Sequence, residues 1–273
     1  MSGRRLAPVS TQWEGVFATA ITPFAEDESL DLEALEARLV RLVDGGVGGI
    51  VVLGPLGEGE SLAPWERDAV VRRSVRAVGG RVPVLVAVAE PTTRGACHFA
   101  VECERAGADG LLVLPSPLYA ADERETRLHH RSVAAAVELG VLEPGDGFGD
   151  GDEHALQAAL LGARGHLSAV ANVCPERAVE RWRLAVAQRF GEAAEEHRAL
   201  EPLRRAVSGG KAVQALKLAQ SLAGLGAETA RAPRLPLTGD ERERMARLLD
   251  QLDVQRTPAA LRQLAVDGAP AGT

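Results

Sequence analysis

The feature that most constrains the fold is a regular alternation between short apolar runs and longer amphipathic segments. The apolar runs predict strands at residues 15–23, 48–54, 81–90 and 110–115. The segments between and after them predict helices at residues 31–46, 62–78, 93–106 and 122–138. Continuous apolar runs are typical of strands buried on both faces of a parallel sheet. The pattern therefore predicts an α/β fold, either a (β/α) barrel or an open doubly wound sheet.

The alternation stops at residues 140–152, where glycine and proline give the composition of a loop or junction. It resumes with a helix near 153–163, a strand at 166–173, and helices near 175–188, 192–207, 210–223 and 239–252. We therefore expect an N-terminal arm at 1–14, a barrel region at 15–188, a helical extension at 189–253 and a flexible tail at 254–273.

Charge and composition exclude several classes of protein. A net charge of −7 argues against a surface for nucleic acid or anionic membrane. No apolar run approaches the roughly 18 residues of a membrane span, and the first residues lack the apolar core of a signal peptide. Cys97, Cys103 and Cys174 lack metal-site spacing and indicate reduced thiols. We expect a cytoplasmic protein without a cofactor or a bound metal.

Six segments together resemble the dihydrodipicolinate synthase / N-acetylneuraminate lyase family of class I aldolases. In chain order they are GVFATAITPF, GPLGEGESLAPWER, GRVPVLVAVAEPTT, GADGLLVLPSPLY, GARGHLSAVANVCPE and RLPL. The resemblance covers residues 13–138 and about 148–253. Each segment is a weak signal alone, and six in the family's order are a strong one.

The resemblance implies a (β/α)8 barrel, a TIM barrel, followed by C-terminal helices and usually assembled as tetramers. It implies a Schiff base between a lysine of the sixth strand and pyruvate or a related 2-oxo acid. It further implies a proton-shuttling tyrosine on the fifth strand. Two threonines in the loop after the second strand would hold the carboxylate of the substrate.

The chain departs from this pattern where the chemistry resides. Its only lysines, Lys211 and Lys217, fall in helices after the barrel. Pro55 and Leu56 stand where the family has the two threonines. The span 15–188 has room for about five or six of the roughly 31-residue units of a complete barrel. We therefore expect a TIM-barrel-derived fold truncated by about two units, without strands five and six and their helices.

A few residues remain candidates for a site. Tyr119 matches the second tyrosine of the family's Pro-Tyr-Tyr segment and is a weak candidate for proton relay, with a subunit contact as the alternative. Gly54, Gly57 and Glu58 keep the shape of the substrate loop. All three are weak candidates for substrate binding. Glu58 could also act as an acid or base at the mouth of the barrel, but the favoured role is structural, as an acceptor for loop amides. Asn172, at the end of the last strand, is expected to be structural.

Asp150, Asp152, Glu153 and His154 form an acidic cluster with one imidazole. Carboxylates with a histidine at the end of a barrel strand could bind a divalent cation. The spacing matches no calcium or zinc motif, so a solvated loop that begins the next helix is the simpler interpretation.

Three functional hypotheses follow. The first is a degenerate family member without Schiff-base activity, in a binding or regulatory role, assembled with itself or with a full-length paralogue. The alternative is a lyase or synthase acting on pyruvate or a related 2-oxo acid. The second alternative is a metal-dependent enzyme using residues 150–154. A gene lesion would also account for the missing segment.

Overall fold

The computed structural model describes residues 13–143, 147–252 and 254. The expected tail and most of the expected N-terminal arm lie outside these residues. The strands are β1 Gly15–Thr19, β2 Gly49–Val52, β3 Val84–Val88, β4 Gly110–Val113, β5 Gly140–Leu142, β6 Phe148–Gly149 and β7 Gly165–Ser168. The α-helices are α1 Leu32–Asp44, α2 Pro64–Val78, α3 Thr93–Ala106, α4 Glu123–Ala134, α5 Ala155–Leu160, α6 Pro175–Val186, α7 Phe190–Ala206, α8 Ala212–Leu222 and α9 Gly239–Gln251.

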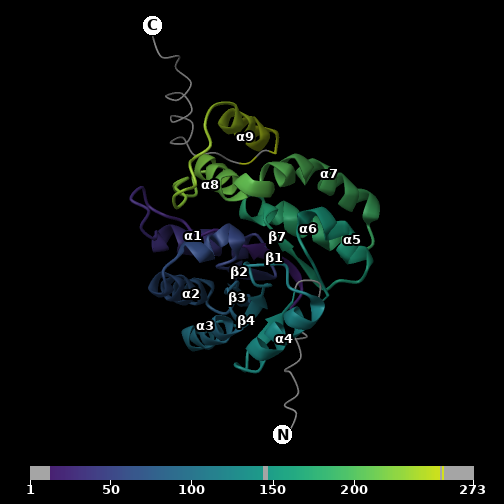
Figure 1. The fold of residues 1–273 in the computed structure, drawn as a ribbon. Coiled ribbons are helices and arrows are strands. Elements are labelled where there is room, and N and C mark those ends of the chain that lie inside the picture. Colours follow the sequence, from purple (N-terminus) through teal and green to yellow (C-terminus); the bar gives the residue numbers. More distant parts are fainter. Residues whose placement is uncertain (1–12, 144–146, 253, 255–273) are drawn as a thin grey trace.

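The strands form one parallel sheet in the order β5-β4-β3-β2-β1-β7-β6. Helices α1 to α6 surround the curled sheet, and α7, α8 and α9 lie together beyond β7 (Figure 1). β5 and β6 are the two edges and do not pair with each other in the described residues. The structure confirms the α/β barrel-derived fold and the C-terminal helices.

The prediction of a loop over all of residues 140–152 is wrong in part. The predicted loss of the fifth strand is also wrong. Residues 140–142 form β5, which pairs in parallel with β4 through Leu111 and Val141. The reason is local: Leu142 is apolar and fully buried, and Gly140 lies opposite Gly110 at the strand start. Seven strands are therefore described, against eight in a complete barrel.

Side chains of the strands alternate between two buried layers. On β4, Leu111 and Val113 point to the outer layer, which packs against the helices. Leu112 points to the inner layer, inside the curl, together with Phe17 and Phe148. These two phenylalanine rings meet edge to face at 5.1 Å between centroids. Since both faces of the sheet are covered, the strands read as continuous apolar runs.

Trp13 belongs to the same inner layer and packs where a side chain of β4 would otherwise stand. A Cβ atom on Gly110 would overlap the Trp13 ring. Gly110→Ala is therefore expected to lower the free energy of unfolding by about 1–3 kcal/mol, measured by urea denaturation. Gly191→Ala is the matched control, because its Cβ would meet open space within helix α7. An equal effect of both substitutions would contradict the tight contact.

Helices α7, α8 and α9 share a second apolar cluster, which includes Leu200, Leu216 and Leu249 and reaches Ile21 just after β1. This contact places α7 and α8 over the carboxyl ends of the strands, where α7 takes part in the site described below.

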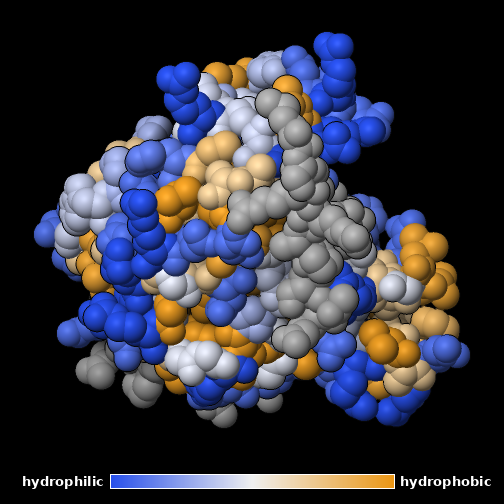
Figure 2. Space-filling model, turned by 90° about the horizontal axis from the view of Figure 1, so that it is seen from below, coloured by the Kyte–Doolittle hydropathy of each residue, from blue (hydrophilic) through white to orange (hydrophobic). Residues whose placement is uncertain are grey.

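The surface is mixed in character. On the face seen from below, hydrophobic residues form separate groups among hydrophilic ones (Figure 2). Leu118, Tyr119 and Leu128 are large apolar side chains that are more than half exposed near α4. In the described part of the chain, none of the helices has the length and hydrophobicity required to span a membrane.

Candidate functional site

A cavity of about 350 Å³ lies at the carboxyl ends of the strands. Its lining comes from β1, β2, β4 and β7, from the turn after β6, and from helix α7. In (β/α) barrels this end of the sheet carries the active site. Gly54 and Gly57 line the cavity, together with Pro55 and Leu56. The apolar pair therefore stands inside the site, where the resemblance implies two threonines.

Neither lysine is among the residues that line this cavity. Lys211 is exposed at the start of α8, where its Nζ lies 2.6 Å from Oε1 of Glu241. Lys217 is in α8 and its side chain is completely buried. Its Nζ lies 2.5 Å from Oε1 of Glu58 and donates to the carbonyl of Thr229 at 2.6 Å.

Lys217 is held as a buried cation. Its ammonium lies 4.0 Å from the centroid of the Phe24 ring, in addition to its contacts with Glu58 and Thr229. Burial lowers the pKa of Lys217 to about 8, and the charge of Glu58 opposes that effect. The ammonium group of Lys217 therefore contacts Glu58, Thr229 and Phe24, and none of these three residues lines the cavity.

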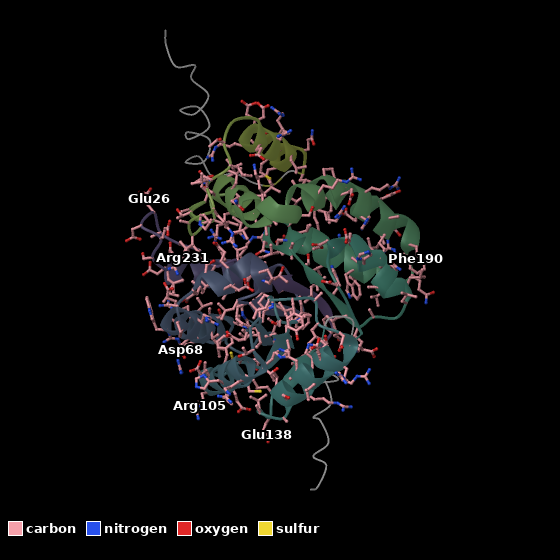
Figure 3. All side chains as sticks on the ribbon, viewed as in Figure 1. Glu26, Asp68, Arg105, Glu138, Phe190 and Arg231 are labelled. Atoms are coloured by element: carbon pink, nitrogen blue, oxygen red, sulfur yellow. The ribbon has the colours of Figure 1, made fainter. Side chains whose placement is uncertain are left out.

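Glu58 joins the loop after β2 to the C-terminal segment. Its Oε2 accepts from the backbone N–H of Arg231 at 3.1 Å and lies 3.3 Å from the guanidinium of Arg234. Arg231 itself pairs with Glu66 of α2 at 2.5 Å, and it is labelled in Figure 3. Glu58 does not line the cavity. The structure thus shows a structural role for Glu58, but with the C-terminal segment as its partner and not the amides of its own loop.

Asp152 turns away from solvent instead of joining a metal cluster. Its Oδ1 accepts from the hydroxyl of Ser168 and from the guanidinium of Arg181, each at 2.7 Å. Its Oδ2 accepts from the backbone N–H groups of Ala169 and Val170, at 2.8 and 2.9 Å. Although burial opposes ionisation, the hydrogen bonds and the Arg181 charge hold the pKa of Asp152 well below its usual range.

The other members of the acidic cluster diverge. Glu153 lies 3.1 Å from Arg204 of α7, and Nδ1 of His154 contacts the carbonyl of Asp150. The described residues contain no group of three or more His, Cys, Asp or Glu side chains placed to hold a metal ion. Because Asp152 has both oxygens engaged, the arrangement does not support a metal-dependent function.

Sequence reasoning missed His166 and Arg181, which complete the Asp152 cluster. His166 is fully buried on β7, its Nε2 accepts from Arg181 at 3.0 Å, and its ring packs 4.8 Å from that of Trp182. The signal was present: a histidine in a strand at a helix-facing position requires a buried partner.

The buried His166 predicts loss of stability in mild acid. Burial lowers the pKa of His166 below its usual 6.5. Asp152 opposes this effect and Arg181 adds to it. Below pH 6.5 the unfolded chain therefore binds more protons at His166 than the folded protein does. The stability that the neutral, buried His166 contributes is complete above pH 6.5 and is lost as the pH falls. His166→Gln is expected to lose less unfolding free energy than wild type between pH 7 and pH 5. His98→Gln, at an exposed site, is the control, and an unchanged pH dependence in His166→Gln would contradict the interpretation.

Tyr119 and Asn172 have different outcomes. Asn172 is buried, accepts from the N–H of Ile21 and donates to the carbonyl of Thr19, which confirms its structural role. Tyr119 is 56% exposed in the loop before α4 and does not line the cavity. A relay role for Tyr119 stays a prediction, and within one chain its side chain is not part of the site.

Comparison with known proteins places this geometry in a family. A sequence model described as the dihydrodipicolinate synthetase family matches residues 12–142 and 147–252. The chain belongs to the dihydrodipicolinate synthetase family. The break in the match, between residues 142 and 147, falls between the two edge strands β5 and β6.

Two relatives of this family illustrate the range of similarity. An uncharacterized DapA-like lyase of Halobacterium salinarum is 41% identical over 127 residues, which are 46% of this chain and 42% of that protein. The chain thus spans less than half the length of that relative. A 4-hydroxy-tetrahydrodipicolinate synthase of Methanospirillum hungatei is 27% identical over 291 residues, with 88% of this chain and 100% of that protein covered.

Solved structures of the family share the fold. A crystal structure of dihydrodipicolinate synthase superposes with a TM-score of 0.83 at 25% identity, covering 88% of this chain and 99% of that one. The chloride-inhibited dihydrodipicolinate synthase of Acinetobacter baumannii, complexed with pyruvate, gives a TM-score of 0.83 at 22% identity, covering 89% and 99%.

Proposed function

We propose that this chain is a degenerate family member without Schiff-base aldolase activity, which binds a small molecule non-covalently in a binding or regulatory role. The observation that carries the proposal is the lysine geometry: the cavity at the carboxyl end of the strands has no lysine in its lining. A Schiff base requires a free amine in reach of the substrate. Arginine cannot replace it, because its guanidinium does not lose a proton in proteins.

The second support is the altered loop. Pro55 has no backbone N–H, and neither Pro55 nor Leu56 has a hydroxyl. A carboxylate at this point of the cavity would lose donors, and an ionised group without hydrogen bonds is costly to desolvate. The loop keeps its shape through Gly54 and Gly57 and has lost its polar side chains.

A lyase or synthase acting on pyruvate or a related 2-oxo acid is the second candidate. The names of the relatives favour it, and so does the lowered pKa of Lys217, since an amine with a pKa near 8 is partly unprotonated at neutral pH. For this candidate to hold, the α8 helix must move and release Lys217 from Glu58 and Thr229.

A turnover assay separates the two candidates. We expect pyruvate mixed with aldehyde acceptors to be consumed no faster by wild type than by a Lys211→Met/Lys217→Met double variant. Turnover in wild type that disappears in the folded double variant would overturn the degenerate interpretation. A circular dichroism spectrum of each protein establishes that it is folded.

Assembly and location belong to the same proposal. We propose that the chain associates with itself or with a full-length paralogue, supported by the exposed Leu118 and Tyr119 in the loop before α4. Light scattering that shows a monomer, alone and with such a paralogue, would refute it. Three free cysteines, of which Cys103 and Cys174 are buried, support a cytoplasmic location.

A further inference from the structure

The cavity at the carboxyl ends of the strands is large enough for a small ligand and mainly apolar inside. Its volume of about 350 Å³ is within the range of ligand pockets. The lower part is formed by inner-layer side chains of the sheet, among them Val51, Leu112 and Leu167. Leu56 and Val207, the residue that follows α7, add further apolar surface.

The polar side chains that could donate hydrogen bonds into the cavity, those of Arg204, Thr19 and Ser208, already have partners. Arg204 donates two hydrogen bonds to the carboxylate of Glu201, at 2.6 and 2.8 Å. It donates a third to Oε2 of Glu153, at 3.1 Å. The hydroxyl of Thr19 donates to the carbonyl of Ser168, and that of Ser208 donates to the carbonyl of Arg205. A ligand therefore meets few donors that are free to bind a carboxylate.

The charge of the lining disfavours anions. Asp150, Asp152 and Glu153 contribute carboxylates, and Arg204 is the one cation among the described lining residues. Since the buried Arg181 already offsets Asp152, the excess is one negative charge. At effective dielectric constants near 20, a like charge about 6 Å away costs roughly 3 kcal/mol before screening. An anionic 2-oxo acid would enter against this field and would find no lysine and no threonine hydroxyls in the loop after β2.

We propose that this cavity binds an electrically neutral, largely apolar small molecule and discriminates against its carboxylate analogue. The proposal rests on the non-covalent function proposed above and adds the chemical class of the ligand. Its basis is the combination of an apolar interior, donor groups that are already engaged, and one lining carboxylate in excess of the cations that pair with the lining.

A matched pair of probes tests the charge preference. The ketone 4-phenylbutan-2-one and the acid 2-oxo-4-phenylbutanoate share a carbon skeleton and differ in a methyl group against a carboxylate. Titration calorimetry with the full chain is expected to show at least about tenfold tighter binding of the ketone, which corresponds to about 1.4 kcal/mol. Leu56→Trp, which fills the cavity, is expected to abolish ketone binding. Leu235→Trp, at a site that is 75% exposed, should leave it unchanged.

A charge variant makes the test independent of cavity filling. Glu153→Gln removes a carboxylate and one partner of Arg204, so acid binding is expected to strengthen severalfold while ketone binding stays the same. Glu195→Gln, an exposed position on α7 outside the lining, is the control and should change neither.

The outcomes separate this inference from the proposed function. Tighter binding of the acid, or no binding of either probe, would overturn the ligand class and leave the non-covalent function standing. An increase in protein mass when the acid and borohydride are added together would show a Schiff base, and would overturn the proposed function itself.

Discussion

Replacement of Lys217 by Met is expected to lower the free energy of unfolding by about 3–5 kcal/mol, because the buried Glu58 then loses its nearest cation. Removing one partner of a buried ion pair leaves an uncompensated charge, which costs more than the pair itself contributes. Urea denaturation followed by circular dichroism measures the change.

A double-mutant cycle isolates the Lys217–Glu58 interaction. The variant Glu58→Gln/Lys217→Met is expected to be more stable than Lys217→Met alone, since it carries no unpaired buried charge. Lys211→Met is the matched control: Lys211 and Glu241 form an exposed pair, worth about 1 kcal/mol or less. If Lys217→Met lowers the free energy of unfolding no more than Lys211→Met does, Lys217 and Glu58 do not form a buried ion pair on which the fold depends.

Asp152→Asn is expected to cost about 3–5 kcal/mol, because the amide nitrogen cannot accept the hydrogen bonds that the carboxylate accepts and Arg181 is left as a buried cation. The same change removes acceptors for the turn after β7, which borders the cavity. Urea denaturation of the variant is the measurement.

The neighbouring Asp150 provides the control for Asp152. Its side chain is exposed, so Asp150→Asn should change stability by less than about 0.5 kcal/mol. Adding Arg181→Met to Asp152→Asn is expected to recover part of the loss, since the unpaired guanidinium is removed. Similar costs for Asp150→Asn and Asp152→Asn would show that Asp152 is not the centre of a buried network.

Local patterns in the sequence predict the sheet and most of the helices. The apolar runs that contain β1 to β4 are long and flanked by glycines, and α3 has the predicted bounds, Thr93–Ala106. By contrast, β5 has three residues and β6 two, so neither presents a periodic signal. Their pairing depends on neighbouring strands that are distant in the sequence, which local propensity does not encode.

The site was also predictable only in part, because the sequence shows local features but not contacts between distant segments. The loop with Gly54 and Gly57 could be located from its sequence, and the loss of the lysine could be counted. The pairing of Glu58 with Lys217 joins the loop after β2 to α8, and the sequence contains no local sign of that contact. The acidic cluster at 150–154 was visible, but only the fold shows that Asp152 faces Arg181 while Glu153 faces Arg204.

Charged residues that resemble catalytic groups are therefore engaged in holding the fold. Lys217 and Glu58 connect α8 to the loop after β2, and Asp152 and Arg181 connect α6 to the turns after β6 and β7. What remains open to a ligand is a mainly apolar cavity. This division supports a family member that keeps the scaffold and binds without covalent chemistry.

The most direct test of that account is the intact mass of the protein after incubation with pyruvate and borohydride. The account predicts an unchanged mass, because neither Lys211 nor Lys217 lines the cavity in the described part of the chain. A stable adduct of one pyruvate per chain would contradict it. Its loss in Lys211→Met or Lys217→Met would identify the amine, and its persistence in both would assign it to the N-terminus.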